Sequence, residues 1–318
     1  MKKVVLGQSG IEVSELCFGT LPMGPLQSNL PLQEGTDLLV EAIEKGVNFF
    51  DSAQLYKSYP YLHAAMKKTG RKDLVISSKS VNKDYQGMEE AILEALKDLD
   101  RDYLDIFFLH APQSGADLFT EWEGAWQCLK DYKAKGYLRA IGAACHKPAA
   151  VLAAADERDI DIVFPLINML GWGYTDGSTV DDMLKAIARA HKQRKGMYAM
   201  KVFAGGHLVS RMPEAIKFVQ DIPGMEALSI GLINKKELDV QLRIFNGEDL
   251  SSEEVASFIN TKQLLVLPFC CTGCGNCVKI CGSNAMEIID EKAVPIAENC
   301  VLCGYCVPAC PEFAIRMR

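Results

Sequence analysis

The first 247 residues alternate between short apolar runs and longer amphipathic stretches. Eight of the short runs have the length of strands, and several are almost entirely apolar, such as Ile106-Phe107-Phe108-Leu109. Continuous apolar runs are typical of parallel strands that are buried on both faces. The predicted strands cover residues 16–18, 48–51, 74–78, 103–110, 140–143, 161–165, 196–201 and 227–230.

Apolar residues recur at helical spacing between these strands, for example at Ile92, Ala95 and Leu99. Other predicted helices lie around residues 38–47 and over residues 122–132, 148–157, 180–193, 213–220 and 235–245. Eight βα units in about 245 residues predict a (β/α)₈ TIM barrel, with an open doubly wound sheet as the alternative. The Gly-x-Gly-x-x-Gly fingerprint of that alternative is absent after the first strand, where Gly19-Thr20-Leu21-Pro22 stands.

Two segments flank the repeating pattern. Residues 4–6 and 11–13 surround Gly7-Gln8-Ser9-Gly10, which predicts a hairpin at the bottom of the barrel. A polar, acidic helix is expected over residues 251–260, and the composition then shifts to Cys, Gly and Pro. We therefore expect an α/β barrel domain of residues 1–262 and a small second domain of residues 263–318.

The bulk composition narrows the class of protein. A chain of 318 residues that is 49% hydrophobic can bury one large core and one small one. The net charge is −7 and no long basic block is present, which argues against nucleic acid as a partner. The sequence shows neither a signal peptide nor an apolar run that could span a membrane, so we expect a cytoplasmic protein.

Eight of the twelve cysteines form two runs with the same spacing. Each run reads C-x₂-C-x₂-C-x₃-C, the spacing that holds [4Fe–4S] clusters in bacterial ferredoxins. In such pairs of runs, three closely spaced thiolates bind one cluster and the fourth ligand comes from the other run. The spacing therefore predicts one cluster on Cys271, Cys274, Cys277 and Cys310, and a second on Cys300, Cys303, Cys306 and Cys281.

A structural zinc ion is the alternative metal that cysteines at this spacing could bind. Zinc sites use pairs of C-x₂-C, and a third cysteine at the same step has no place in a tetrahedral site. Cys270 stands one residue out of register and is not expected to be a ligand. The second domain is therefore predicted to be a bacterial-ferredoxin-like α+β module with two clusters.

Polar residues stand at the carboxyl ends of the second, third and fourth predicted strands. Asp51, Lys79 and His110 each close a strand, and Tyr56 follows Asp51 on the loop. Barrel enzymes build their active sites at this face. A lysine beside a tyrosine would lower the pKa of the phenol, the aspartate would orient the lysine, and the histidine would donate to a carbonyl oxygen. Alone, each residue also has an ordinary structural explanation.

Residues 1–247 resemble the aldo/keto reductase superfamily, within it the ferredoxin-fused branch. The resemblance lies in "LGQSGIEVSELCFGT", "GVNFFDSAQLY", "DIFFLH", "KGYLRAIGAACH", "VFPLINML" and "ALSIGLINKKELDVQL". It implies that the catalytic tetrad of that family is Asp51, Tyr56, Lys79 and His110. Several positions differ from the usual patterns. Lys57 replaces a common glycine, and Gly282 replaces the proline that ends a ferredoxin run. At the implied cofactor site, Ala144-Cys145-His146 lacks the usual hydroxyl, Met200 stands in place of the stacking aromatic residue, and Ile233 stands in place of the usual arginine.

The resemblance also implies NADP(H) as a cofactor, bound across the top of the barrel. The implied contact residues are Gly19, Thr20, Asn168, Lys201, Gly205, Gly206, Asn234, Lys235 and Gln241. Of these, Gly19 and Thr20 would lie near the nicotinamide. The loop from Lys201 to Gly206 would lie at the pyrophosphate, and residues 234–241 would lie at the adenosine phosphate.

Three hypotheses for the function remain open at this point. The first is reduction of a carbonyl-containing small molecule with NADP(H) and the clusters as redox partners. The second is delivery of single electrons from the clusters, with Tyr56 supplying the proton. The third is an electron-transfer protein with a vestigial barrel. An external ferredoxin or flavoprotein would be the electron donor, and we expect the module to pack on the top face with one cluster near Tyr56 and His110.

Overall fold

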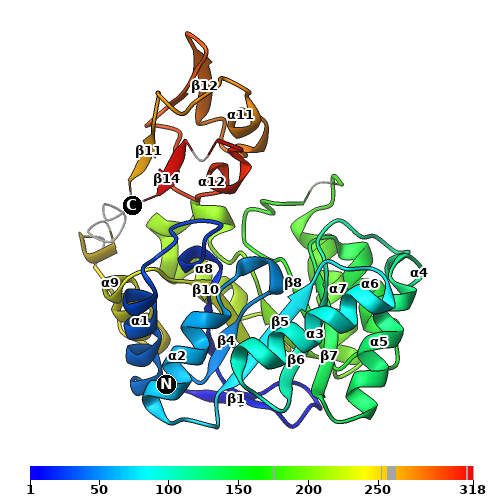
Figure 1. The fold of residues 1–318 in the computed structure, drawn as a ribbon. Helices are drawn as coiled ribbons and strands as arrows, with labels where there is room; N and C mark the ends of the chain where they lie inside the picture. The colour runs from blue at the N-terminus through cyan, green and yellow to red at the C-terminus, as the bar shows by residue number, and fades with distance from the viewer. Residues whose placement is uncertain (175, 252, 256–262, 313, 318) are drawn as a thin grey trace.

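Eight parallel strands form a closed barrel in the computed structural model, which describes residues 1–174, 176–251, 253–255, 263–312 and 314–317. Neighbouring strands follow the order β10-β3-β4-β5-β6-β7-β8-β9, which confirms the (β/α)₈ prediction (Figure 1). The barrel strands are β3 (Leu16–Gly19), β4 (Phe49–Asp51), β5 (Val75–Ser80), β6 (Leu104–Ala111), β7 (Leu138–Cys145), β8 (Ile162–Pro165), β9 (Gly196–Ala199) and β10 (Ala227–Gly231).

Helices follow the strands and cover the outside of the barrel. Their apolar faces pack on the outward side chains of the strands in one large core. The helices are α1 (Leu32–Glu44), α2 (Tyr59–Thr69), α3 (Tyr85–Leu99), α4 (Leu118–Glu121), α5 (Glu123–Ala134), α6 (Pro148–Asp156), α7 (Val180–Lys192), α8 (Met212–Gln220) and α9 (Lys235–Phe245). Among the described residues, no helix is both long and apolar enough to cross a membrane.

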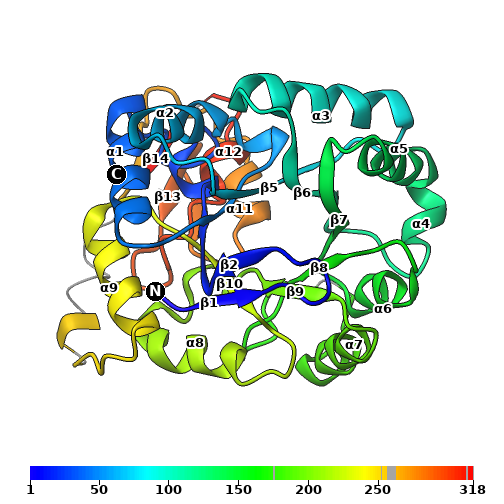
Figure 2. The same cartoon turned by 90° about the horizontal axis from the view of Figure 1, so that it is seen from below.

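The predicted hairpin closes the bottom of the barrel. Strands β1 (Lys3–Val5) and β2 (Glu12–Ser14) pair antiparallel and lie across the lower opening (Figure 2). Leu6, Ile11 and Val13 are buried in the same cluster as the inward side chains of the barrel strands. The top face is therefore the open end, where the carboxyl ends of the strands and their loops lie.

The second domain is a small α+β module. Strand β11 (Leu264–Val266) pairs with β14 (Ile315–Met317), and β12 (Met286–Ile289) forms a hairpin with β13 (Lys292–Pro295). Two short helices, α11 (Asn276–Ile280) and α12 (Cys306–Ala309), follow the two cysteine-rich loops. The domain boundary near residue 262 and most of the helix predicted over 251–260 fall outside the described part of the chain.

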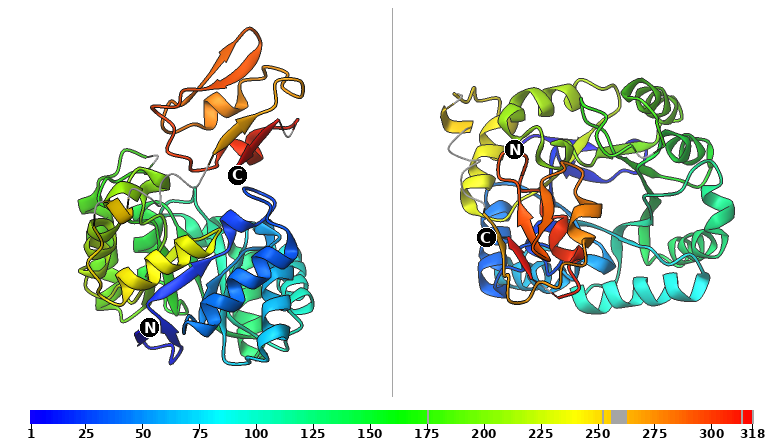
Figure 3. Two further views of the ribbon diagram at one scale, coloured as in Figure 1. Left: turned by 90° about the vertical axis from the view of Figure 1, so that its left-hand side faces the viewer. Right: turned by 90° about the horizontal axis from the view of Figure 1, so that it is seen from above.

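The module lies over the top face of the barrel. Figure 3 shows it from the side and from above, standing over one part of the barrel opening rather than beside the barrel wall. The second cysteine-rich loop, which contains Cys300 and Cys303, faces the barrel, whereas the β12–β13 hairpin points away from it (Figure 1). This is the arrangement expected from the position of the strand-end loops.

Candidate active site and cysteine cavities

Four predicted catalytic residues meet at the top of the barrel. Asp51 ends β4, Lys79 lies near the end of β5, and His110 lies near the end of β6. Tyr56 ends a single 3₁₀ turn between β4 and α2. The ammonium of Lys79 donates to Asp51 Oδ1 at 2.9 Å, to Asp51 Oδ2 at 2.7 Å and to the Ser52 carbonyl at 2.8 Å. Both charged side chains are buried, so this ion pair is a fixed part of the barrel interior.

A further tyrosine supports Asp51 from below. The Tyr198 hydroxyl lies 3.2 Å from Asp51 Oδ1 and 3.0 Å from Ser77 Oγ, and the Ser77 hydroxyl donates to the same carboxylate oxygen at 2.9 Å. The Tyr198 ring stacks on Phe164 with 3.9 Å between ring centroids. Sequence analysis did not identify Tyr198, although its alternation with outward residues in β9 places it inside the barrel.

Tyr56 is a neutral phenol in this environment. Burial raises its pKa well above the ordinary value, and the negative charge of Asp51 raises it further. The predicted lowering of the Tyr56 pKa by Lys79 is therefore not found. The physical reason is that Lys79 directs its ammonium at Asp51 and Ser52, while the Tyr56 ring centroid lies 4.7 Å from Nζ. Tyr56 thus holds a proton that it can donate to a stronger base.

His110 is a neutral imidazole beside Tyr56. Its ring is perpendicular to that of Tyr56, with 6.0 Å between centroids. Burial lowers the pKa of His110 well below its ordinary value, and the positive charges of Lys79, His146 and Lys201 lower it further. Its Nδ1 is buried without a hydrogen-bond partner among the described residues. A neutral imidazole can donate one hydrogen bond to a substrate oxygen without carrying a charge.

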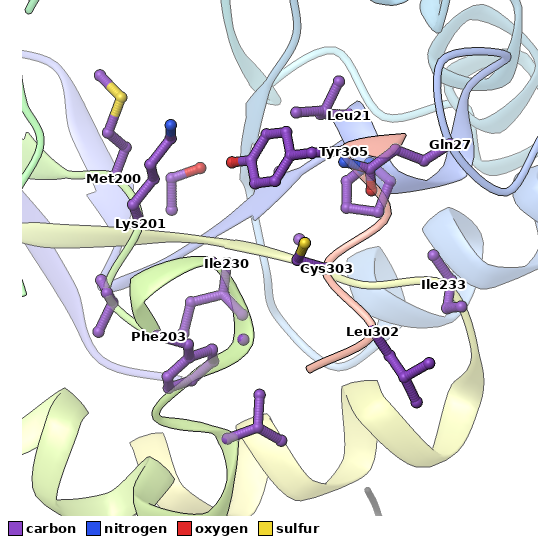
Figure 4. Close-up of a pocket in the computed structure, with 18 of the residues that line it drawn as sticks. Leu21, Gln27, Met200, Lys201, Phe203, Ile230, Ile233, Leu302, Cys303 and Tyr305 are labelled. Carbon is purple, nitrogen blue, oxygen red and sulfur yellow. The ribbon is translucent and has the colours of Figure 1, made fainter. Parts of the chain in front are cut away.

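The top-face cavity joins two residues of the tetrad to the module, whereas Lys79 and His110 do not line it. It has a volume of about 440 Å³ and is lined by residues of both domains. Asp51 and Tyr56 line it from the barrel, and Cys300, Cys303 and Tyr305 line it from the module. Figure 4 shows Cys303 and Tyr305 of the module across from Met200 and Lys201 of the barrel. A cavity of this size accommodates a small organic molecule. The module therefore forms a wall of the candidate active site.

Three barrel loops hold the module in place. The Ser283 hydroxyl and His207 Nε2 are 2.9 Å apart, which gives one hydrogen bond across the domains. A Cβ built on Gly282 would lie 3.1 Å from the Trp172 ring. A Cβ built on Gly304 would lie 3.4 Å from the Gln27 side chain. These contacts come from both cysteine-rich loops, so docking depends on the fold of the whole module.

The predicted cofactor positions divide into two groups. Gly19, Lys201, Gly205 and Gly206 line the cavity. The side-chain amide of Asn168 instead bonds the backbone of its own loop, and Asn234 caps α9 by accepting from Glu237 N. Thr20, Lys235 and Gln241 do not line the cavity either. The Thr20 hydroxyl is hydrogen-bonded to Ser58, and Lys235 forms an ion pair with Glu41. The Gln241 side-chain amide donates to Met212 Sδ.

Eight cysteines surround two small cavities in the module. One cavity is lined by Cys271, Cys274, Cys277 and Cys310, and the other by Cys281, Cys300, Cys303 and Cys306. Each set takes three cysteines from one run and one from the other, as the spacing predicts. Cys270 lines neither cavity.

Backbone amides in the module point at cysteine sulfurs. They donate from Ala293 to Cys271, from Ala285 to Cys281 and from Ala314 to Cys310, at 3.1 to 3.3 Å. The bond from Ala293 is the main reason why the pKa of Cys271 lies below its ordinary value. Such N–H···S bonds stabilise thiolates, so the donor set fits iron–sulfur clusters.

Comparison with known proteins gives the family. The profile of the aldo/keto reductase family matches residues 15–257, about three quarters of the chain. The chain belongs to the aldo/keto reductase family. The profile of the 4Fe-4S dicluster domain matches residues 270–315, which supports iron–sulfur clusters in the module of this aldo/keto reductase.

Curated relatives match only part of the aldo/keto reductase domain. Methylglyoxal reductase DkgA of Escherichia coli O157:H7 is 29% identical over 140 residues, covering 43% of this chain and 49% of the relative. Glyoxal reductase of Bacillus subtilis (strain 168) is 34% identical over 114 residues, covering 34% of this chain and 39% of the relative. This chain thus spans about half or less of the length of these two relatives.

Solved structures share the barrel fold. A Pseudomonas aeruginosa protein described as an aldo-keto reductase superposes with a TM-score of 0.65 at 23% identity, covering 80% of this chain and 95% of that chain. An aldo-keto reductase from Bacillus halodurans in its holo form superposes with a TM-score of 0.64 at 18% identity, covering 80% of this chain and 94% of that chain.

Proposed function

We propose that this chain is an oxidoreductase that reduces the carbonyl group of a small molecule in the top-face cavity, with NADP(H) and the iron–sulfur clusters as its redox partners. One observation carries the proposal: the proton-bearing Tyr56 and the cluster cysteines Cys300 and Cys303 line the same cavity. Relatives named as reductases of methylglyoxal and glyoxal support a small carbonyl compound as substrate.

The tetrad residues and the side chains that support them would have complementary roles in this reaction. Reduction of a carbonyl to an alcohol consumes two electrons and two protons. Tyr56 donates the proton that the carbonyl oxygen takes up, because an alkoxide is a far stronger base than a phenolate. His110 donates a hydrogen bond to the same oxygen as negative charge develops on it. Lys79 and Asp51 hold a fixed dipole beneath Tyr56, and Tyr198 and Ser77 keep Asp51 in place.

Two kinds of redox group would supply the electrons in this proposal. Nicotinamide supplies two electrons as hydride, and a [4Fe–4S] cluster supplies one electron at a time. Gly19, Lys201, Gly205 and Gly206 would contact the dinucleotide, and the two sets of four cysteines would hold the clusters. Cys274 is exposed, so the cluster farther from the barrel would be the one that an external ferredoxin or flavoprotein reaches.

Reduction by the clusters alone is a second candidate function. Asn168 uses its amide for its own loop, Asn234 caps a helix, and Lys235 pairs with Glu41. Three of the side chains that the family resemblance assigned to the dinucleotide are thus engaged elsewhere. This observation favours electrons that arrive through the module and leave Tyr56 as the proton source.

Anaerobic single-turnover experiments test both functions. Protein as purified is mixed with methylglyoxal and either NADPH or NADH, and protein reduced beforehand with dithionite and desalted is mixed with methylglyoxal alone. Product formed with a nicotinamide supports the first function, and product formed only by the reduced protein, with reoxidation of its visible absorption, supports the second. No product under any condition, from protein with full iron content and across a panel of aldehydes and ketones, would contradict both.

A further inference from the structure

Three buried hydroxyl groups lie at the base of the loop that carries Tyr56. The Thr20 and Ser58 oxygens are 2.7 Å apart, and the Ser58 and Ser52 oxygens are 2.8 Å apart. All three side chains are fully buried, so water does not compete for these hydrogen bonds. None of the three lines the top-face cavity, and the proposed function uses none of them to hold the dinucleotide.

The direction of this hydroxyl chain follows from counting its protons. The Thr20 hydroxyl donates to the Asp51 carbonyl at 2.9 Å, and a hydroxyl has only one proton to donate. Ser58 must therefore donate to Thr20, which uses the single proton of Ser58. Ser52 must then donate to Ser58. The hydroxyl chain thus runs in one direction and ends on the backbone of Asp51.

The hydroxyl chain closes the loop that carries the proposed proton donor. Ser52 and Ser58 stand on either side of residues 53–57, and Tyr56 belongs to this segment. The hydrogen bond between the two serines ties the ends of the segment together inside the protein. The Lys79 ammonium donates to the Ser52 carbonyl at 2.8 Å and fixes the same end of the loop to β5. The position of the Tyr56 side chain therefore depends on the hydroxyl chain.

A second anchor of the loop lies at the surface and is weaker. Lys57 forms an ion pair with Glu94 of α3, and the Lys57 side chain is 59% exposed. The Gln54 side chain donates to the same carboxylate at 2.7 Å. Exposed ion pairs contribute little because water and salt screen them. The buried hydroxyl chain is therefore the stronger of the two anchors.

We propose that Ser58 is a positioning residue, which holds Tyr56 through the hydroxyl chain in the place required for proton transfer to the substrate. The inference rests on the proposed function, in which Tyr56 is the proton donor. Proton transfer requires the donor within hydrogen-bond reach of the substrate oxygen, and small displacements slow it strongly. Loss of the Ser58 oxygen breaks two hydrogen bonds at once, because it leaves Ser52 without an acceptor and Thr20 without a donor.

Substitution of Ser58 by Ala tests this role in the anaerobic holoprotein, with methylglyoxal and the electron source that supports turnover. We expect kcat to fall at least roughly tenfold and KM to stay within about threefold of wild type, because the walls of the cavity are unchanged. The solvent isotope effect on kcat should rise, since proton transfer becomes slower. Thr36→Val is the control, because it removes a buried hydroxyl that has no hydrogen-bond partner among the described residues.

Two substitutions of Thr20 test the hydroxyl chain with little change in volume. Thr20→Val keeps the shape and removes the hydroxyl, so kcat should fall as in Ser58→Ala. Thr20→Ser keeps the hydroxyl and should retain most of the wild-type kcat. The opposite order, with Thr20→Val faster than Thr20→Ser, would show that packing decides and would overturn the proposal. This pair carries the same test if Ser58→Ala does not fold.

A double-mutant cycle shows whether Ser58 acts through Tyr56. The Tyr56→Phe variant has no phenolic proton left to position. Adding Ser58→Ala to it should therefore leave the residual single-turnover rate within about twofold of Tyr56→Phe alone. A further loss as large as that in the wild-type background would mean that Ser58 acts on another group, and would overturn the proposal.

Hydrogen exchange separates this inference from the proposed function. Ser58→Ala should speed exchange of the backbone amides of residues 53–58, which include the Tyr56 amide bonded to the Ala53 carbonyl at 3.0 Å. The barrel strands should stay protected and the iron content unchanged. Faster exchange at this loop, in a protein whose wild type reduces no carbonyl compound, supports the anchor and contradicts the function. Unchanged exchange there overturns the inference, and the function stands wherever the wild type is active.

Discussion

The carbonyl oxygen of Val301 lies against the backbone of Gly206, so closely that a Cβ on Gly206 would be 2.6 Å from it. Gly206 belongs to the barrel loop after β9, and Val301 lies between two cluster cysteines. The contact brings the module onto the barrel and defines the roof of the cavity. It also makes the glycine at position 206 a condition of docking.

The substitution Gly206→Ala should therefore separate the module from the barrel. The new methyl group would collide with the Val301 carbonyl, and a residue with φ 116° is unfavourable for alanine as well. We expect faster hydrogen exchange around Ser283 and His207, whose hydrogen bond crosses the interface. Gly136→Ala is the control, because Gly136 also has a positive φ but nothing lies within 4 Å of its Cβ position. Unchanged exchange in Gly206→Ala would contradict the docking described above.

Substitution of Tyr56 by Phe should abolish carbonyl reduction. The change removes the proton donor and keeps the ring that packs against Lys79 and His110. We expect kcat to fall by roughly 10²–10⁴-fold, the contribution of a positioned general acid. Iron content and ligand affinity should stay near those of the wild type. Tyr103→Phe, at a half-exposed position before β6, serves as the control, and activity within a few-fold of wild type in Tyr56→Phe would reject the assignment.

Much of the barrel is predictable because each strand carries its own signal. The run Ile106–Leu109 within β6 is apolar throughout, and the polar residues at or near the ends of β4, β5 and β6 indicate a candidate active face from the sequence alone. The prediction fails where tertiary contacts override the local pattern. The strand predicted to reach Lys201 ends at Ala199, because Lys201 adopts a left-handed backbone. Helix α2 is absent from the sequence-based prediction, although Pro60 stands in its first turn, where proline is well tolerated.

The roles of two unusual residues become clear only in the folded chain. Lys57 occupies a left-handed position, at φ 52°, which explains why a glycine is common there. Gly282 stands where a ferredoxin run usually has proline, and the Trp172 ring occupies the space that a side chain would need. Docking of the module depends on such contacts between distant residues. Such contacts cannot be inferred from the spacing of residues along the sequence.

Glu226 should make the stability of the barrel depend on pH. Its carboxylate accepts from Gly7 N at 3.3 Å and from Met197 N at 2.7 Å, and so joins the bottom hairpin loop to β9. Burial raises its pKa to about 7, above the value of roughly 4.3 in an unfolded chain. An acid with a raised pKa in the folded state contributes stability below the unfolded pKa and loses it as the pH rises through the folded pKa.

We therefore expect this contribution to the free energy of unfolding to fall between about pH 4.5 and 7.5, by about 1–3 kcal/mol. The measurement is the difference in apparent melting temperature between the wild type and Glu226→Gln across this range, under anaerobic conditions. Because glutamine does not titrate, the difference should shift in favour of the variant as the pH rises. A difference that is independent of pH would show that the pKa of Glu226 is not raised.

The last prediction concerns the crossed arrangement of cysteines. Cys310 follows the second run in sequence but lines the cavity of Cys271, Cys274 and Cys277, and Cys281 lines the other cavity. With two [4Fe–4S] clusters, the wild type should hold about eight iron atoms per chain. Cys310→Ala should disrupt the cluster held by Cys271, Cys274 and Cys277. Cys281→Ala should disrupt the other cluster, in the cavity that Tyr305 also lines.

The two variants differ in a measurable way because the cavities differ in their distance from the barrel. Loss of the cluster near Tyr305 should also loosen the docked loop, and faster hydrogen exchange around Val301 and Gly206 should report it. Loss of the outer cluster should leave that interface protected. Cys270→Ala is the matched control, since Cys270 is adjacent to a predicted ligand and lines neither cavity. If each substitution damaged the cluster of its own run, as seen by iron analysis and electron paramagnetic resonance, the crossed ligation would be wrong. Full iron content in both variants would contradict both cysteine assignments.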